Sequence, residues 1–322
     1  MLFRQLESFL VTAEECNFTR AAQKLFISQQ ALSEQINRLE AEYGAKFFQR
    51  GKKLELTYEG QCMLKTAKEI LQLNRQLCNQ LNDRSPTLQG ELTFGLSFAR
   101  ARTFFPVVLK SFHEKYPLVK VNIKSGNLVA LKHYIAAGMV DLVMSYDYYQ
   151  DLNLHKIPLG TERLYAIIPQ SILIQLYPDS WKEQIPLFSQ GIGVQAFSQI
   201  PLMLVNAQNH IYGAIHEQYR KYNLLPNIFF ESNDMDLLYN LAKTGMGITF
   251  LPELLVATKT DLFQDQGSHT LYAFPLQDSA TDMPFIIGYS KKHYLSLPMQ
   301  EFIKELQQQY FLLTDQVRAS QN

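Results

Sequence analysis

The stretch FTRAAQKLFISQQALSEQINRLE, Phe18 to Glu40, predicts two short helices joined by a tight turn. In the first helix Ala21, Ala22 and Leu25 recur at helical spacing and form an apolar face. The segment FIS interrupts this pattern, and Ser28 is placed to cap the second helix. The apolar positions of that helix are Ala31, Leu32, Ile36 and Leu39. Small residues in the first helix allow close packing, as a helix-turn-helix requires.

The second predicted helix leaves polar side chains on its other faces. These are Gln29, Gln30, Ser33, Glu34, Asn37 and Arg38. Amides at the start of such a helix can read base edges in the major groove of DNA. An ordinary helical hairpin with a solvated polar face has the same periodicity, so periodicity alone leaves both interpretations open.

The next segment, KFFQRGKKLELTYEG, predicts a strand, a turn at Gly51 and a second strand. Its basic residues Arg50, Lys52 and Lys53 cluster at the tip. A basic hairpin directly after a helix-turn-helix is typical of a wing that contacts phosphates or enters the minor groove. A solvated cationic hairpin is the alternative.

A long helix is predicted from Thr57, and a mostly apolar set of residues on it repeats at three and four positions. The repeat consists of Leu64, Ala67, Leu71, Asn74, Cys78 and Leu81. Such a seam needs a partner helix, so we expect dimerisation through it. Pro86 and Gly90 then predict a hinge into a new domain.

Taken together, the motifs between Leu6 and Gly60 resemble the N-terminal domain of LysR-type transcriptional regulators. That family typically shows phenylalanine-threonine-x-alanine-alanine, serine-glutamine-proline-alanine-x-serine, arginine-leucine-glutamate and leucine-threonine-x-x-glycine. The corresponding segments here are FTRAA, SQQALS, RLE and LTYEG. The combination is far more specific than any one of these motifs.

The resemblance implies that Gln29 and Ser33 face the major groove, Arg20 touches the DNA backbone, and Arg50 reaches phosphate or the minor groove. The full expected DNA-binding set is Arg20, Ser28, Gln29, Gln30, Ser33, Asn37, Arg38, Arg50, Lys52 and Lys53. Gln30 stands where the family often has proline, and Glu34 adds a carboxylate that phosphates repel. Base preference is therefore expected to differ from that of a typical member.

Charge limits how this DNA contact can work. The whole chain has 30 Lys or Arg and 30 Asp or Glu. Residues 1 to 60 hold eight Lys or Arg against eight Glu, so the predicted DNA-binding unit has no net positive charge. We expect binding to depend on placed contacts and on several linked copies acting together.

After Gly90 short apolar strands alternate with helical segments in two successive sets. The predicted fold class is α/β: an N-terminal winged helix-turn-helix, a long linker helix, and a two-lobed effector domain that resembles periplasmic binding proteins. We expect the winged helix-turn-helix at 1–58, the dimerisation helix and hinge at 59–90, and the effector domain at 91–322. Lobe I would comprise 91–161 and 269–313, and lobe II 162–268, with hinges near Gly160 and Gly267.

A cleft between two such lobes is the usual ligand site. The segment LSFARAR ends a strand and begins a helix that carries Arg100 and Arg102, which predicts an anion site, unless both arginines face solvent. The candidate effector-binding residues are Ser97, Phe98, Arg100, Arg102, Asn127, Tyr146, Asn206, Gln208 and Gly247, with His210 beside them. Polar residues in loops also serve as turn formers, which is the alternative for several of these.

Other classes of function lack their residue patterns. The seven histidines have no metal-binding spacing, and we find no GxSxG motif, no P-loop and no cysteine with an obvious base. We therefore expect no metal, no cofactor and no enzymatic activity. The three cysteines show no CxxC spacing and fit a reducing cytosol, and no apolar run reaches the ~18 residues that a membrane span needs.

The sequence thus predicts a cytoplasmic regulator with four kinds of partner. They are double-stranded promoter DNA, a small anionic effector with a carboxylate as first candidate, further copies of the chain in a homodimer or homotetramer, and RNA polymerase as a further candidate. No membrane contact is expected. The alternative is a cytoplasmic ligand sensor whose N-terminal helices bind a protein partner.

Overall fold

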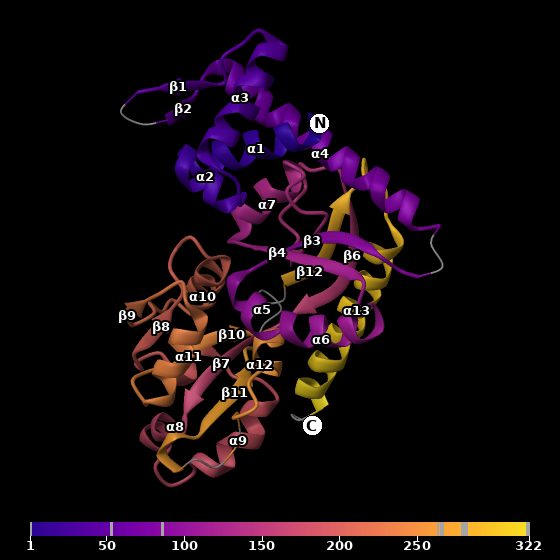
Figure 1. Cartoon of the computed structure of the whole chain (residues 1–322). Coiled ribbons are helices and arrows are strands. Elements are labelled where there is room, and N and C mark those ends of the chain that lie inside the picture. Colours follow the sequence, from indigo (N-terminus) through magenta and orange to yellow (C-terminus); the bar gives the residue numbers. More distant parts are fainter. Residues whose placement is uncertain are drawn as a thin grey trace.

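The computed structural model describes residues 2–51, 54–84, 87–262, 264, 267–277 and 283–319. Its N-terminal part is a small helical unit with a two-stranded hairpin, and the remainder forms two lobes, each built around β-structure (Figure 1). The helix α4 (Tyr58–Asn82) leads from the first part to the second. No helix within the described ranges is long and apolar enough to cross a membrane.

The N-terminal unit has the predicted winged helix-turn-helix architecture. Its elements are α1 (Leu2–Glu15), α2 (Phe18–Lys24), α3 (Gln29–Tyr43), β1 (Phe48–Arg50) and β2 (Leu54–Leu56). The Ser28 hydroxyl accepts a hydrogen bond from the Ala31 amide at 3.1 Å and caps α3. The side chains of Leu32, Ile36 and Leu39 are buried in one hydrophobic core with Ala21 and Ala22, whereas Ala31 is only half-buried. Lys52 and Lys53, at the tip of the hairpin, lie outside the described residues.

The predicted seam on α4 divides into two parts. Its first residues, Leu64, Ala67 and Leu71, pack into the core of this chain's own N-terminal unit and are covered mainly by α1. Further along the helix, Leu73, Leu77 and Leu81 are exposed and form an apolar stripe, of which only Leu81 belongs to the predicted seam. Helical periodicity indicates which positions are apolar but not which neighbour covers them, so the first part of the expected seam is covered by this chain itself.

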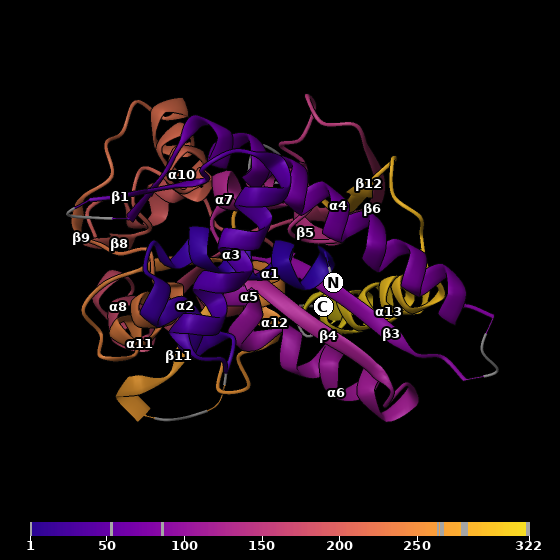
Figure 2. The ribbon, with the colours of Figure 1, turned by 45° about the horizontal axis from the view of Figure 1, so that its top comes forward.

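Helix α4 also contacts the first strand of the lobe that follows it, β3 (Gly90–Leu96), as Figure 2 shows. The side chain of Gln72 is buried, and its Nε2 lies 2.9 Å from His293 Nδ1. Gly138 has φ +64° and lies so close to Gln72 that a side chain at this position would collide with Gln72 Oε1. Further along α4, Asn79 Nδ2 donates to the Glu91 carbonyl oxygen at 3.1 Å. Polar contacts thus fix α4 to this lobe.

Lobe I is a five-stranded sheet in the order β4-β3-β5-β12-β6. Besides β3, its strands are β4 (Val119–Ser125), β5 (Leu142–Tyr146), β6 (Leu154–Glu162) and β12 (Met283–Ser290). β3 runs parallel to β4 and β5, and β12 runs antiparallel to β5 and β6. The associated helices are α5 (Phe98–Thr103), α6 (Phe105–Lys115), α7 (Leu128–Ala136) and α13 (Leu297–Ala319). This is the predicted alternation of strands and helices, closed by a long C-terminal helix.

Lobe II contains a three-stranded sheet and a two-stranded one. In the first, β7 (Leu164–Pro169) lies between β10 (Thr249–Pro252) and β11 (Leu271–Pro275), and in the second β8 (Leu202–Leu204) runs parallel to β9 (Ile228–Glu231). An isolated bridge from Leu202 to Ile248 connects the two sheets. The helices are α8 (Gln170–Leu176), α9 (Trp181–Ser189), α10 (His210–Lys221), α11 (Met235–Lys243) and α12 (Glu253–Ala257), with short 3-10 turns at Val194–Phe197 and Gly267–His269.

The return from lobe II to lobe I differs from the expected boundary at residue 268. Strand β11 pairs antiparallel with β7, so lobe II continues to Pro275 and the chain re-enters lobe I between Pro275 and Met283. Gly267 therefore belongs to a turn inside lobe II and is not at a crossover. The apolar pattern of Leu271–Pro275 predicts a strand, but strand pairing, which is long-range, decides which sheet receives it. The other crossover falls between β6 and β7, close to Gly160 as expected.

Candidate functional site

The predicted DNA-reading face lies on α3. Gln29, Gln30, Asn37 and Arg38 are exposed and Ser33 is half-buried, so these side chains share the outer faces of the helix. The Thr19 hydroxyl at the start of α2 donates to Gln29 Oε1 at 3.1 Å. This bond places the starts of α2 and α3 on one side of the unit and orients the Gln29 amide.

Cations around this face are paired with carboxylates of the same unit. Arg20 donates to the Glu15 carbonyl oxygen at 2.5 Å, and its Nε lies 3.5 Å from the Glu15 carboxylate. Lys24 Nζ lies 3.0 Å from the same carboxylate, and Arg38 lies 2.5 Å from Glu34 one turn earlier in α3. Exposed pairs of this kind are worth at most ~1 kcal/mol, so a phosphate can replace the carboxylate. Of Arg50, the structure describes only the backbone, in β1.

A cavity of about 300 Å³ lies between the two lobes. Six of the nine predicted effector residues line it: Ser97, Phe98, Arg100, Asn127, Tyr146 and Gln208. The wall also includes residues that sequence reasoning missed, among them Tyr134 and Met144 from lobe I and Asn209, Asn233 and Met235 from lobe II. Their signal in the sequence is weak, because a wall residue of a cleft resembles any other helix-start or strand-end residue.

Three predicted residues do not line the cavity. Arg102 points away from it, and Asn206 accepts a hydrogen bond from the Gln208 amide at 3.2 Å, which makes it a turn former. Gly247 is buried, and a Cβ there would lie 2.5 Å from the Pro201 carbonyl oxygen. Glycine at 247 thus allows close approach of lobe II's own backbone.

Arg100 has its partners within the protein. Its side chain is buried, and Nη2 lies 2.5 Å from Glu162 Oε2 and 3.0 Å from the Tyr146 hydroxyl. The same Glu162 oxygen accepts from Tyr146, and the other oxygen accepts from the Leu254 amide at 3.1 Å. Burial raises the pKa of Tyr146, and the Glu162 charge acts in the same direction. Because Glu162 neutralises it, Arg100 is a structural cation beside the cavity.

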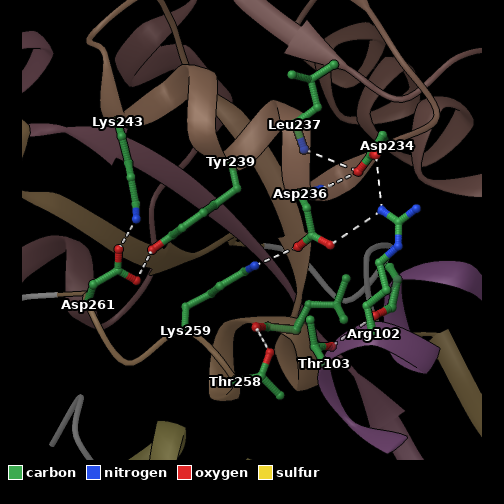
Figure 3. A network of polar contacts seen from close by, with 12 residues as sticks. Arg102, Thr103, Asp234, Asp236, Leu237, Tyr239, Lys243, Thr258, Lys259 and Asp261 are labelled. Atoms are coloured by element: carbon green, nitrogen blue, oxygen red, sulfur yellow. Dashed lines mark hydrogen bonds and ion pairs between the residues drawn. The ribbon is translucent and has the colours of Figure 1, made fainter. Parts of the chain in front are cut away.

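Arg102 instead connects the lobes outside the cavity (Figure 3). From α5 its Nη1 reaches Asp234 at 3.1 Å and Asp236 at 3.9 Å, at the start of α11 in lobe II. Desolvation by itself would raise the pKa of Asp234. The hydrogen bond from Arg102 acts in the opposite direction and holds this pKa below its ordinary value. Asp236 also pairs with Lys259 at 2.7 Å, so the bridge continues into lobe II. The expectation of a paired Arg100 and Arg102 anion site is thus not met by the geometry.

Three helix starts surround the cavity instead. Ser97, Asn127 and Asn209 cap α5, α7 and α10, with side-chain oxygens 3.4, 2.9 and 3.1 Å from the amides that they accept from. Backbone N–H groups and helix dipoles at such ends favour a hydrogen-bond acceptor or an anion. The remaining wall is largely apolar, with Phe98, Leu128 and Met144 on it.

His210, at the start of α10, is held across the cleft. Its ring lies 4.1 Å from the Tyr146 ring in an edge arrangement. Burial, with a smaller contribution from the Arg100 charge, lowers the pKa of His210 to about 3. The imidazole is therefore neutral near pH 7 and adds no charge to the cavity.

Comparison with known proteins follows the same division of the chain. Residues 3–61 match the family of bacterial regulatory helix-turn-helix proteins, lysR family, and residues 86–310 match the LysR substrate binding domain. The chain is 26% identical over 299 residues to the uncharacterized HTH-type transcriptional regulator YcgK of Bacillus subtilis strain 168, covering 91% of this chain and 90% of that protein. It is 27% identical over 314 residues to the HTH-type transcriptional regulator BsdA of the same strain, covering 94% and 99%.

Solved structures share the fold over nearly the whole length. A full-length OxyR variant from Pseudomonas aeruginosa matches with a TM-score of 0.68 at 19% identity, covering 97% of this chain and 95% of that one. Full-length CbnR complexed with its target DNA matches with a TM-score of 0.63 at 19% identity, covering 96% and 100%. The relatives are transcriptional regulators and not enzymes. Among the described residues no cluster of side chains could hold a metal ion.

Proposed function

Because the chain belongs to the LysR family, it is a DNA-binding transcriptional regulator with an effector-binding domain, and we propose how its two parts act together. In this proposal α3 reads base edges in the major groove, and the β1–β2 hairpin contacts the DNA backbone or minor groove. A small effector enters the cavity between the lobes and shifts the equilibrium between two placements of the DNA-binding units. The protein would act in the cytoplasm, where promoter DNA is found.

The observation that carries this proposal is the cavity itself. Both lobes contribute to its wall, so a ligand in it has contacts that depend on the angle between the lobes. A ligand changes an equilibrium only as far as it prefers one state, and a site shared by two lobes supplies that preference.

We further propose that the effector carries one acceptor group, with a carboxylate as first candidate, and an apolar remainder. The helix starts capped by Ser97, Asn127 and Asn209 would receive the acceptor, because Glu162 already occupies Arg100. Phe98, Leu128 and Met144 would contact the remainder. This keeps the anionic effector expected from the sequence but moves its recognition from arginine side chains to backbone amides.

A thermal shift screen tests the effector proposal. Small carboxylic acids and their primary amides, matched in size and tested at one salt concentration, are compared for their effect on Tm. Binding to the folded state raises the free energy of unfolding by RT ln(1 + [L]/Kd), about 2.7 kcal/mol at a hundredfold excess over Kd. If the acids raise Tm and their amides do not, the result supports an anion at the helix starts. Stabilisation by amides alone would contradict it.

DNA binding is tested by footprinting on the DNA upstream of the protein's own gene and of its divergent neighbour. The proposal expects protection over a dyad-symmetric site, because linked copies of one unit bind matching half-sites. RNA polymerase is a candidate partner at such a site. Protection that changes with an effector found in the screen would connect the two halves of the proposal.

The second candidate function is a ligand sensor that acts through a protein partner. It is favoured by one observation, the equal number of acidic and basic residues in residues 1 to 60. Gel shifts with genomic fragments at low salt separate the two, since low salt strengthens any phosphate contact. Failure to bind every fragment, with a folded oligomer in hand, would favour the sensor.

A further inference from the structure

The turn between α2 and α3 carries an exposed aromatic side chain. Phe26 is 96% exposed, the highest value among the large apolar side chains that the structure describes. Its backbone has φ +54°, in the left-handed region. Both features are unfavourable for phenylalanine, since water meets the ring and the Cβ is crowded by the backbone.

The hydrogen bonds identify the turn as a Schellman motif. The Ile27 amide donates to the Ala22 carbonyl oxygen and the Phe26 amide donates to the Gln23 carbonyl oxygen, both at 3.1 Å. Phe26 therefore occupies the position after the helix cap at which glycine is the usual residue. The turn needs no side chain here, and the ring packs against almost nothing in this chain. Neither local geometry nor packing accounts for phenylalanine.

Phe26 lies next to the residues that are predicted to read DNA. It lies two residues before Ser28, which caps α3, and three before Gln29, whose amide is held by Thr19. The nearby cations Arg20 and Lys24 are already paired with Glu15. Residues 1 to 60 have equal numbers of acidic and basic residues, so apolar contacts with DNA would add affinity that does not depend on the salt concentration.

We propose that Phe26 is a DNA-contact residue that packs on the 5-methyl group of a thymine, at the edge of the bases read by α3. Phenylalanine is one of the side chains that make apolar contact with the thymine methyl in the major groove. The ring would then bury in the complex the surface that it exposes in the free protein. This inference rests on the proposed DNA binding, and its test begins from the footprinted site.

The test combines Phe26→Gly with a deoxyuridine scan. Each thymine of one half-site is replaced in turn by deoxyuridine, which lacks only the methyl group. For the wild-type protein one replacement should lower affinity on the order of fourfold, the effect of losing about one buried methylene-sized group. Phe26→Gly should bind the unmodified site more weakly and show no further loss at that thymine. The same variant should raise Tm by about 2 °C or more, because glycine relieves the strained turn.

Asn223→Gly is the matched control. Asn223 has φ +53° and occupies the same position of a Schellman motif after α10, where the Leu224 amide donates to the Tyr219 carbonyl oxygen at 2.9 Å. Glycine there should leave DNA affinity unchanged. If Phe26 contacts DNA, Phe26→Gly should raise Tm and lower the affinity for DNA. If Phe26 has a structural role, the substitution should lower both Tm and affinity.

Two results would overturn the inference. One is unchanged affinity of Phe26→Gly for a site that the wild-type protein protects. The other is weaker binding with an undiminished response to deoxyuridine, which would assign the ring to the sugar-phosphate backbone. Absence of any footprint by the wild-type protein is a different result, because it contradicts the proposed DNA binding itself.

Discussion

At the scale of single residues, Gln29 is the best-placed base reader. It is the first residue of α3, it is exposed, and Thr19 holds its side-chain oxygen at 3.1 Å, which directs the amide nitrogen as a donor. We expect Gln29→Ala to cost about 1–3 kcal/mol of specific binding, with little change on random DNA. Titrations of the footprinted site and of a scrambled duplex measure both. The control is Gln80→Ala, which replaces an exposed glutamine on α4. Equal losses of Gln29→Ala on both duplexes would show that Gln29 positions the protein without reading bases.

Arg100 illustrates how burial changes the role of a residue. We expect Arg100→Ala to lower the free energy of unfolding by about 3–5 kcal/mol, because Glu162 would remain as an unpaired buried charge. Arg102→Ala should cost less than about 1 kcal/mol, since its bridge to Asp234 is exposed. Urea denaturation of both variants gives the comparison. Similar small losses would mean that water reaches the Arg100–Glu162 pair.

At the scale of elements, α4 carries the apolar stripe of Leu73, Leu77 and Leu81 on the side turned away from its own chain. Four-residue spacing places these side chains one above the other, as in a helix pair. We expect Leu77→Lys to weaken the homodimer at least tenfold, because a charge would enter the contact. Sedimentation at several concentrations measures this. The control is Leu225→Lys, at a position that is 87% exposed in lobe II, and it should leave assembly unchanged. If the Leu77→Lys protein assembles normally, the dimer contact lies elsewhere.

At the scale of the whole molecule, His210 of lobe II contacts the Tyr146 ring of lobe I across the cleft. The pKa of His210 is lowered from 6.5 to about 3, whereas the unfolded chain has the ordinary value. The unfolded state therefore binds more protons below pH 6.5, and stability is lost progressively as the pH falls from 6.5 toward 3. Between pH 7 and pH 5 this amounts to at most about 2 kcal/mol.

The corresponding variant is His210→Gln, which should be less sensitive to this acid range than the wild-type protein. Unfolding followed at pH 7 and pH 5 gives the comparison, and His113→Gln, an exposed histidine on α6, is the control. An unchanged pH response in His210→Gln would mean that the ring is already solvated in the folded state.

Local patterns in the sequence determined the elements of this molecule. The spacing of Ala21, Ala22 and Leu32 and the cap at Ser28 predicted the N-terminal helices, because helix formation depends on neighbours within a few residues. The alternation after Gly90 likewise predicted two successive sets of strands and helices, and six of nine predicted effector residues line the cavity. Strand ends and helix starts gather at one edge of a parallel sheet, so their sequence positions locate a cleft.

Tertiary structure alone decided what each side chain meets. Arg100 and Glu162 are 62 residues apart in the sequence, and only the fold brings the carboxylate to the arginine. Pairing of β11 with β7 moved the lobe boundary, and the packing of Leu64, Ala67 and Leu71 places the first part of the expected seam in the core of the chain's own N-terminal unit. The sequence shows whether each residue is apolar or charged. Which partner satisfies it depends on contacts between distant segments, and these are set by the packing of the whole chain.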